Sequence, residues 1–179
     1  TGNSRRKLDV PGEKEFDGKG VSYCASCDGP FFADKDVAVV GGGNAGFETA
    51  SELLAYCKSV TLIEEEKFRA DPVTIKKILD NPKMKALENT SPVEIKGDKF
   101  VKSLVYQKTA PFVDKIEIEV EGIFVEIGHM PATAFIESTG IEMNEYKRIK
   151  TDHKTQRTSI EGIWAAGDCT DNLYFQNMI

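Results

Sequence analysis

The sequence predicts an α/β fold in which a parallel βαβ unit precedes a three-stranded antiparallel meander. Three observations predict it. A β-branched strand ends in a run of glycines at 36–43, a helical pattern of apolar residues follows at 44–57, and apolar–polar alternation begins near residue 92. With 179 residues, the chain is long enough for one ordinary domain, or for a small domain plus part of another.

The first half of the chain has the order of a βαβ unit. It starts with the short apolar strand "DVAVVGGG" (36–43), continues with a helix over "NAGFETASELLAYC" (44–57), and returns with the β-branched strand "SVTLIE" (59–64). Such a unit makes a right-handed crossover between two parallel strands. A second helix is expected over 72–80, because Pro72 suits its first turn.

The middle of the chain alternates apolar and polar residues. The segments "PVEIKGD" (92–98), "VKSLVYQK" (101–108) and "KIEIEVEG" (115–122) predict three antiparallel strands. The strict alternation of the third segment indicates that one face of the meander is in water. The next segment, "GIFVEIG" (122–128), has the composition of a more buried strand.

The two ends of the chain are less regular. Residues 1–20 are polar and are interrupted by Pro11 and four glycines, which predicts a connector. After Gly128 the sequence offers two short strand candidates, "RIKTD" (148–152) and "GIWAAGD" (162–168).

Composition and charge narrow the class of protein. A net charge of −6 and a pI of about 5.1 argue against nucleic acid or an anionic membrane as partner, because both attract basic surfaces. The apolar runs are too short to cross a bilayer, and no signal-peptide pattern opens the chain. The four unevenly spaced cysteines do not suggest a secreted disulfide scaffold, so we expect a cytoplasmic protein.

The glycine run carries a dinucleotide-binding pattern. Gly41, Gly43 and Gly46 form GxGxxG directly after a strand and at the start of a helix. The first glycine allows the tight turn, the second lets the backbone approach a pyrophosphate, and the third lets helix and strand pack closely. The pyrophosphate would lie at the positive end of the helix. The other loop positions that we assign to this Rossmann-like site are Gly42, Asn44 and Ala45.

An acidic residue at the end of the second strand completes the pattern. Glu64 follows the loop by roughly 20 residues, the spacing at which a carboxylate hydrogen-bonds a ribose. It would repel a 2′-phosphate, as would Glu65 and Glu66, whereas Lys67 and Arg69 could partly offset that repulsion. The sequence therefore predicts NADH in preference to NADPH.

The pair Cys24 and Cys27 forms a CxxC motif in "SYCASCDGP" (22–30). A structural zinc site needs four ligands, and the remaining cysteines and histidines form no second paired motif, which makes a zinc-binding module the weaker alternative. A purely structural disulfide would close too short a loop to stabilise much. A redox role fits better, with Asp28 placed to give or take the proton of thiol chemistry. Cys57 lies on the apolar face of the predicted helix, as a core residue would.

Five segments in order identify a family resemblance. They are "YCASCDGPFF", "VAVVGGGNAGFETA", "FRAD", "GIFVEIGHMPAT" and "GIWAAGDCTD". Together they resemble the low-molecular-weight thioredoxin reductases and the related flavoprotein subunit of alkyl hydroperoxide reductase, which are pyridine nucleotide-disulfide oxidoreductases. The resemblance covers nearly the whole chain.

The resemblance implies an oxidoreductase in which NAD(P)H reduces FAD and the flavin reduces the CxxC disulfide. It implies that Cys27 faces the flavin, that Cys24 attacks the disulfide of a thioredoxin-like or glutaredoxin-like partner, and that Asp28 is the acid/base. The same resemblance suggests a homodimer. The residues that it adds to the cofactor sites are Arg69, Gly128 and Asp168.

The resemblance also implies a division of the chain. Residues 1–8 would be the tail of an FAD domain, 9–128 a nicotinamide domain carrying the CxxC, and 129–179 an incomplete return of the FAD domain. The family's first GxGxxG has no counterpart before Gly41, so we expect a fragment that cannot hold FAD tightly alone. "DNLYFQN" (171–177) resembles a protease-tag site, but we favour natural sequence.

Three alternatives remain open on the sequence alone. The chain could be a nicotinamide-binding module without turnover of its own. Its parent could use NADPH, or an unusual electron donor such as a ferredoxin or a flavin nucleotide.

Overall fold

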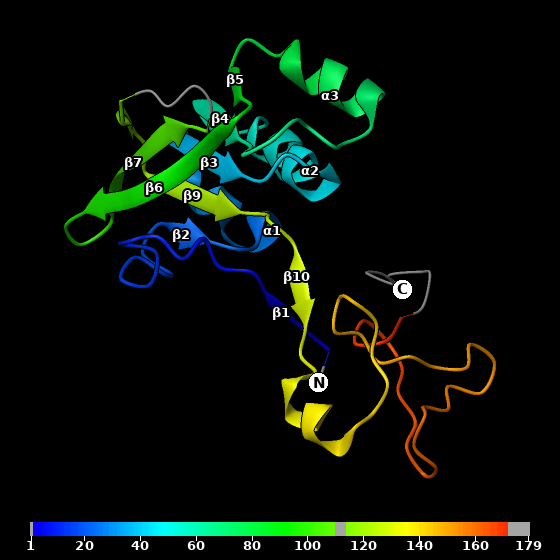
Figure 1. Cartoon of the computed structure of the whole chain (residues 1–179). Helices are drawn as coiled ribbons and strands as arrows, with labels where there is room; N and C mark the ends of the chain where they lie inside the picture. Colours follow the sequence, from blue (N-terminus) through cyan, green and yellow to red (C-terminus); the bar gives the residue numbers. More distant parts are fainter. Residues whose placement is uncertain (1, 110–113, 172–179) are drawn as a thin grey trace. The chain divides into compact units, whose positions relative to one another are not determined.

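The computed structural model describes residues 2–109 and 114–171. The chain forms two compact units, Lys7–Gly128 and Thr1–Arg6 with His129–Ile179 (Figure 1). Apart from Asp171, the tag-like stretch 171–177 lies outside the described residues.

The unit Lys7–Gly128 is built on a five-stranded sheet in the order β2-β9-β3-β4-β5, with every neighbouring pair parallel. Its strands are β2 (Val21–Ser22), β3 (Asp36–Val40), β4 (Ser59–Ile63), β5 (Met84–Leu87) and β9 (Gly122–Val125). The two central strands, β3 and β4, are joined by a helix, as the βαβ pattern predicts. They pair over five residues, from Asp36 opposite Ser59 to Val40 opposite Ile63.

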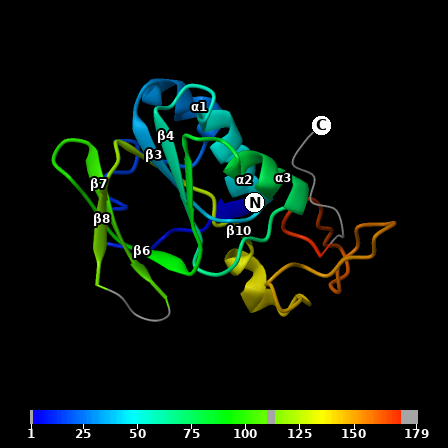
Figure 2. The same ribbon diagram turned by 90° about the horizontal axis from the view of Figure 1, so that it is seen from above.

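Helices cover one face of this sheet and an antiparallel sheet covers the other (Figure 2). The helical elements are α1 (Ala25–Asp28), η1 (Gly29–Phe32), α2 (Asn44–Leu53) and α3 (Pro72–Leu79). The carboxylate of Asp71 accepts hydrogen bonds from the backbone N–H groups of Val73 and Thr74, which fixes the start of α3. Proline at the first position of α3 adds to that signal.

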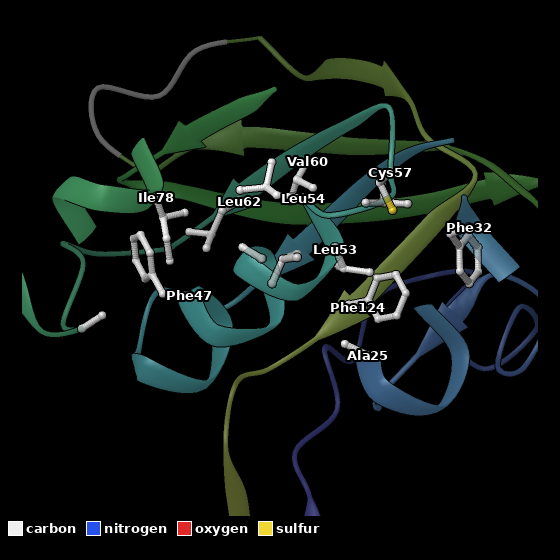
Figure 3. Close-up of a cluster of buried hydrophobic side chains, with 14 residues drawn as sticks. Ala25, Phe32, Phe47, Leu53, Leu54, Cys57, Val60, Leu62, Ile78 and Phe124 are labelled. Atoms are coloured by element: carbon white, nitrogen blue, oxygen red, sulfur yellow. The ribbon is translucent and has the colours of Figure 1, made fainter. Parts of the chain in front are cut away.

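The two faces of the sheet explain why its strands are continuously apolar. On β3, Val37 and Val39 pack with the helices, whereas Ala38 and Val40 pack toward the antiparallel sheet. Strands buried on both faces have no polar side to display. Figure 3 shows the helical side, where Phe47 of α2 and Phe124 of β9 belong to one buried cluster.

The antiparallel sheet has the order β6-β7-β8. Its strands are β6 (Thr90–Gly97), β7 (Val101–Lys108) and β8 (Ile116–Glu119). Pro92 lies in the edge strand beside a register shift, the kind of position where a residue without an N–H is tolerated. On β8, Ile118 packs against the core, but Ile116 is exposed to solvent. More of this outer strand is therefore in water than the one face that its alternation predicts.

The second unit contains few regular elements among its described residues. Strand β1 (Asn3–Arg5) pairs antiparallel with β10 (His129–Pro131), and η2 (Ala134–Thr139) follows. Isolated bridges hold the rest, including Ile149 with Thr170.

The predicted fold class is confirmed, and four local predictions were wrong. Segments 148–152 and 162–168 form only isolated bridges, and residues 1–20 contain strand β1 and so are not all connector. The helix predicted over 44–57 ends at Leu53, because the chain must turn before β4 begins at Ser59. Strand β5 (Met84–Leu87) was missed, since its residues lack β-branching.

Candidate dinucleotide and disulfide sites

The glycine-rich loop joins the end of β3 to the start of α2. Gly41 has φ +126°, and a Cβ there would overlap the carbonyl oxygen of Glu126. A Cβ on Gly46 would overlap the carbonyl oxygen of Gly41, so helix and loop touch directly. A Cβ on Gly43 would meet no atom within 4 Å. The first and third glycines are thus required by packing, whereas the second faces open space.

That open space lies at the N-terminus of a ten-residue helix. Gly43 is the N-cap of α2 and supplies no side-chain cap, so the N–H groups of the first turn remain available to an anion. Asn44 is held instead toward α3, because its Oδ1 accepts the backbone N–H of Asp71 at 2.9 Å. These features fit a phosphate group beside Gly43.

Glu64 lies under the loop, and its side chain is 6% exposed. Its carboxylate accepts hydrogen bonds from the backbone N–H groups of Gly42 and Glu66. A buried carboxylate with such partners fixes the shape of the loop. The sequence placed Glu64 at this edge of the sheet, but it did not show that the side chain also supports the glycines.

The two cations near Glu64 are both paired with glutamates. Arg69 lies between Glu64 and Glu66, with N–O distances of 3.4 Å and 2.9 Å. Lys67 Nζ lies 2.6 Å from a carboxylate oxygen of Glu88, and this hydrogen bond lowers the pKa of the Glu88 carboxyl. Neither cation therefore presents an uncompensated positive charge at the end of β4.

The CxxC motif lies directly after the edge strand β2. Cys24 and Cys27 form a disulfide, and Cys24 is the N-cap of the short helix α1. Cys27 is exposed, whereas Cys24 is half-buried. The disulfide is therefore accessible at the surface of the unit.

A buried serine connects the strand to the residue after the motif. The Ser22 hydroxyl donates to Asp28 Oδ2 at 2.6 Å and accepts the backbone N–H of Cys24 at 3.1 Å. The Cys24 carbonyl oxygen also lies 3.4 Å from this hydroxyl, so Asp28 Oδ2 at 2.6 Å is the nearer acceptor of its proton. Sequence reasoning missed Ser22. Its only signal was its place at the end of a strand, two residues before the first cysteine.

A cavity of about 470 Å³ opens beside this group. Ser22 and Asp28 line it together with aromatic residues from η1 and from the turn between β6 and β7. Two of these aromatic side chains are strongly exposed, Phe31 at 75% and Phe100 at 63%. Polar groups of the CxxC region thus lie next to an accessible apolar surface.

Two further predicted positions are Gly128 and Asp168. Gly128, with φ +89°, ends the unit Lys7–Gly128, and Asp168 belongs to the other unit. There the carboxylate of Asp168 accepts a hydrogen bond from Asn3 Nδ2 at 2.9 Å, and the buried Asn3 Oδ1 has no hydrogen-bond partner in the described part of the chain. An unpartnered buried acceptor beside a carboxylate fits a site for a hydroxyl-bearing ligand.

The other cysteines are buried, and burial raises the pKa of the Cys57 thiol to about 11. Among residues 2–109 and 114–171, no group of three His, Cys, Asp or Glu side chains could hold a metal ion. Within the same residues, every helix is too short or too polar to cross a membrane.

Comparisons with known proteins agree with the resemblance found in the sequence. The chain is 42% identical over 180 residues to a Bacillus subtilis protein named NADH dehydrogenase, covering 100% of this chain and 35% of that protein. It is 40% identical over 180 residues to a subunit of alkyl hydroperoxide reductase from Pseudomonas putida, covering 100% of this chain and 34% of the relative. The crystal structure of Lactococcus lactis thioredoxin reductase matches with a TM-score of 0.88 and 37% identity, over 98% of this chain and 58% of that one.

The chain therefore spans between about one third and just over one half of the length of these relatives. A family model described as pyridine nucleotide-disulphide oxidoreductase matches residues 1–178, which include the glycine-rich loop and the CxxC disulfide. The chain belongs to the pyridine nucleotide-disulphide oxidoreductase family.

Proposed function

We propose that this chain is the nicotinamide-binding and disulfide-bearing part of an NADH-dependent disulfide reductase. One observation carries the proposal. The unit Lys7–Gly128 combines a dinucleotide loop with an accessible disulfide, and the disulfide is followed by a carboxylate held by a buried hydroxyl. A metal module would need further ligands around the two cysteines, and a structural disulfide would not need the Ser22–Asp28 pair.

The loop residues bind the dinucleotide in this proposal. The pyrophosphate lies beside Gly43 and receives N–H groups from the first turn of α2. The preference for NADH follows from the charges, since Glu64 and Glu66 already neutralise Arg69, and Glu88 neutralises Lys67. A 2′-phosphate would have to compete with these glutamates for its cations. The Bacillus subtilis relative, named NADH dehydrogenase, agrees with this choice.

The disulfide residues carry the electrons onward. A bound flavin would supply the transfer of two electrons from the nicotinamide to the Cys24–Cys27 disulfide, and the two protons of the resulting dithiol would come from the hydride of NADH and from water. The Cys24 thiolate then attacks the partner's disulfide, forming a mixed disulfide and releasing one partner thiolate. The Cys27 thiolate attacks Cys24, which restores the Cys24–Cys27 disulfide and releases the second. The two protons of the former dithiol end on the two partner thiols, and Asp28 is the group that transfers them.

The flavin would be held in part by the second unit. Asp168 and the unpartnered Oδ1 of Asn3 are the residues that would bind its hydroxyl groups. Gly128, which lies after β9, would let the backbone approach a cofactor.

The partner is a protein disulfide of the thioredoxin-like or glutaredoxin-like kind. The exposed Phe31 and Phe100 beside the cavity offer an apolar contact next to the disulfide, as a protein substrate requires. The names of the thioredoxin reductase structures point the same way. We also propose a cytoplasmic location, because the CxxC must be able to cycle between dithiol and disulfide, and a homodimeric parent, as the family resemblance implies.

A paired calorimetric titration of NADH and NADPH into the chain tests the nucleotide part. We expect NADH to bind at least tenfold more tightly, and Glu66→Lys, which removes one partner of Arg69 and adds a positive charge, to reduce that ratio. Glu119→Lys makes the same charge change on β8, in the antiparallel sheet of the same unit, and should leave the ratio unaltered. Tighter binding of NADPH, or binding of neither nucleotide, would contradict the proposal.

A second candidate is a nicotinamide-binding module without turnover of its own. The observation that favours it is length, since the chain covers 34–58% of the relatives compared above. Adding NADH, FAD and a small disulfide to the chain decides between the two. Disulfide reduction supports the reductase, whereas nucleotide binding without reduction supports the module. Reduction only when NADH is replaced by reduced ferredoxin or reduced flavin nucleotide would indicate a different electron donor.

A further inference from the structure

The chain order reverses at strand β3. Strand β4 follows β3 through α2 on one side, whereas β9 joins β3 on the other side only after the antiparallel sheet β6-β7-β8. In parallel α/β sheets, ligands bind outside the carboxyl ends of the strands at such a reversal, and dinucleotides lie across it. The residues that follow β3, β4 and β9 are therefore the ones that a bound dinucleotide would meet.

The residue that follows β9 is Glu126. Its backbone N–H donates to the carbonyl oxygen of Val40 at 2.8 Å, and its own carbonyl oxygen lies against Gly41, as the overlap with a Cβ there shows. Its carboxylate accepts a hydrogen bond from Thr49 Oγ1 at 3.0 Å. Thr49 belongs to α2, so the carboxylate lies on the helical side of the sheet, the side on which the glycine loop enters the helix.

The position of Glu64 decides which half of the dinucleotide lies near Glu126. An acid at the end of the strand after the glycine loop marks the ribose of the adenosine half. Glu64 ends β4, on one side of β3, and the phosphate position at Gly43 lies at the end of β3 itself. The nicotinamide half of the dinucleotide must then extend from β3 toward β9, on the side of β3 opposite to β4. Glu126 is the acidic side chain that directly follows that strand.

The two oxidation states of the nicotinamide differ in charge. Loss of a hydride, which carries two electrons and one proton, converts the neutral dihydronicotinamide ring into a cation. A half-buried carboxylate near the ring attracts the cationic form and has no comparable interaction with the neutral one. Glu64 and Glu66 lie near the adenosine half of the dinucleotide, which is the same in NADH and NAD⁺. They therefore do not distinguish the two forms.

We propose that the Glu126 carboxylate lies near the nicotinamide ring of the bound dinucleotide and makes the chain bind NAD⁺ more tightly than NADH. This inference rests on the proposed dinucleotide function and adds a residue that the glycine pattern does not include. The consequence concerns direction. If bound NAD⁺ is stabilised relative to bound NADH, hydride donation from the bound nucleotide is favoured, and a tenfold difference in affinity corresponds to about 30 mV for a two-electron couple.

Calorimetry with three ligands tests the proposal on the chain as it stands, without flavin. The ligands are NAD⁺, NADH and ADP-ribose, which lacks the nicotinamide ring. In Glu126→Gln we expect the affinity for NAD⁺ to fall about five- to tenfold, the affinity for NADH to change less than twofold, and the affinity for ADP-ribose to stay the same. Glu126→Asp keeps the charge and should retain most of the preference for NAD⁺.

Glu121→Gln provides the matched control, because Glu121 immediately precedes the same strand at the opposite edge of the sheet. It should leave all three affinities unchanged. An equal loss of all three ligands in Glu126→Gln would assign the residue to loop structure and overturn the inference. Unchanged affinities would overturn it as well. If none of the ligands binds the unaltered chain, the dinucleotide function itself fails, and this result is distinct from the other two.

Discussion

The glycine-rich loop and the disulfide turn belong to the same unit but are constructed in different ways. The loop is enclosed, with Gly41 and Gly46 pressed against backbone and Glu64 buried beneath. The disulfide turn follows the edge strand β2 and exposes Cys27. It is ordered by the hydrogen bonds that Ser22 donates to Asp28 and accepts from the Cys24 N–H. The loop is shaped by close backbone packing and a buried carboxylate, whereas the turn is shaped by polar contacts at an accessible surface.

The difference follows from what each site would have to bind. A phosphate is held by backbone N–H groups, so the chain itself must approach the ligand and side chains must be absent. A disulfide must be reached by another disulfide, so its sulfur atoms must be open to attack. Substitutions in the loop should therefore act on stability or binding, and substitutions in the turn should act on rate.

The largest effect is expected from Gly46→Ala. Alanine is the better helix former, so propensity alone predicts a gain of about 1 kcal/mol in α2. The added methyl group would instead overlap the carbonyl oxygen of Gly41, which belongs to the backbone and cannot turn aside. We expect a loss of about 3 kcal/mol in the free energy of unfolding, measured by urea denaturation. A stabilised variant would show that the helix and loop are not in contact.

The same substitution three residues earlier should separate stability from binding. Gly43→Ala places its methyl group in open space, so the urea midpoint should stay close to that of the unaltered chain. The methyl group would occupy the space where the pyrophosphate is expected, and we predict at least a tenfold loss of NADH affinity by calorimetry. Undiminished binding would mean that the phosphate lies elsewhere.

Particular residues show how far the sequence could predict this structure. The strand at 36–40, its glycines and the next strand were recognisable because spacing alone specifies a βαβ unit. The antiparallel sheet was recognisable from alternation. Strand β5 was not, because "MKAL" owes its conformation to pairing with β4 and has little strand propensity of its own.

The sites show the same division. Motif spacing located the CxxC and the acid at the end of β4. It could not locate Ser22 or Glu126, because neither belongs to a motif. Ser22 is identified by its hydrogen bond to Asp28, and Glu126 by its hydrogen bond from Thr49 of α2. Nor could it show that Arg69 and Lys67 are paired with glutamates, since these pairs depend on side-chain direction.

In the disulfide turn we expect a smaller effect, from Ser22→Ala. The chain is reduced, and the rate at which the dithiol reacts with 4,4′-dithiodipyridine is followed by stopped flow across the pH range. Loss of the hydroxyl removes the hydrogen bond to Asp28 Oδ2 and the acceptor of the Cys24 backbone N–H. We predict a three- to tenfold slower reaction across the pH range, because Asp28 is less well positioned.

Ser26→Ala is the matched control for that experiment. Ser26 lies between the two cysteines, but its hydroxyl donates to Glu52 of α2 at 3.1 Å, away from the Ser22–Asp28 pair. Its rate and its pH profile should match those of the unaltered chain. If both serine variants behave alike, Ser22 has no particular role in positioning Asp28.

The smallest contribution to thiol chemistry is expected from Cys57, which lies in the packed interior beside α2. Burial raises the pKa of its thiol to about 11 and removes it from solvent. At pH 8 the thiol is almost wholly protonated, so brief treatment of the reduced chain with iodoacetamide should alkylate Cys24 and Cys27 and leave Cys57 unmodified in the peptide map. Rapid alkylation of Cys57 at pH 8 would show that the helical side of the sheet opens readily, and the contrast between a packed interior and an accessible turn would not hold.

The same buried thiol should also make stability depend on pH. In the unfolded chain the Cys57 thiol ionises near pH 9, whereas in the folded chain its pKa is about 11, so the unfolded state binds fewer protons between these two values. The free energy of unfolding should therefore fall as the pH rises through that range. Cys57→Ala should reduce this slope in urea denaturation curves recorded at successive pH values. An unchanged slope would assign the loss of stability to other groups.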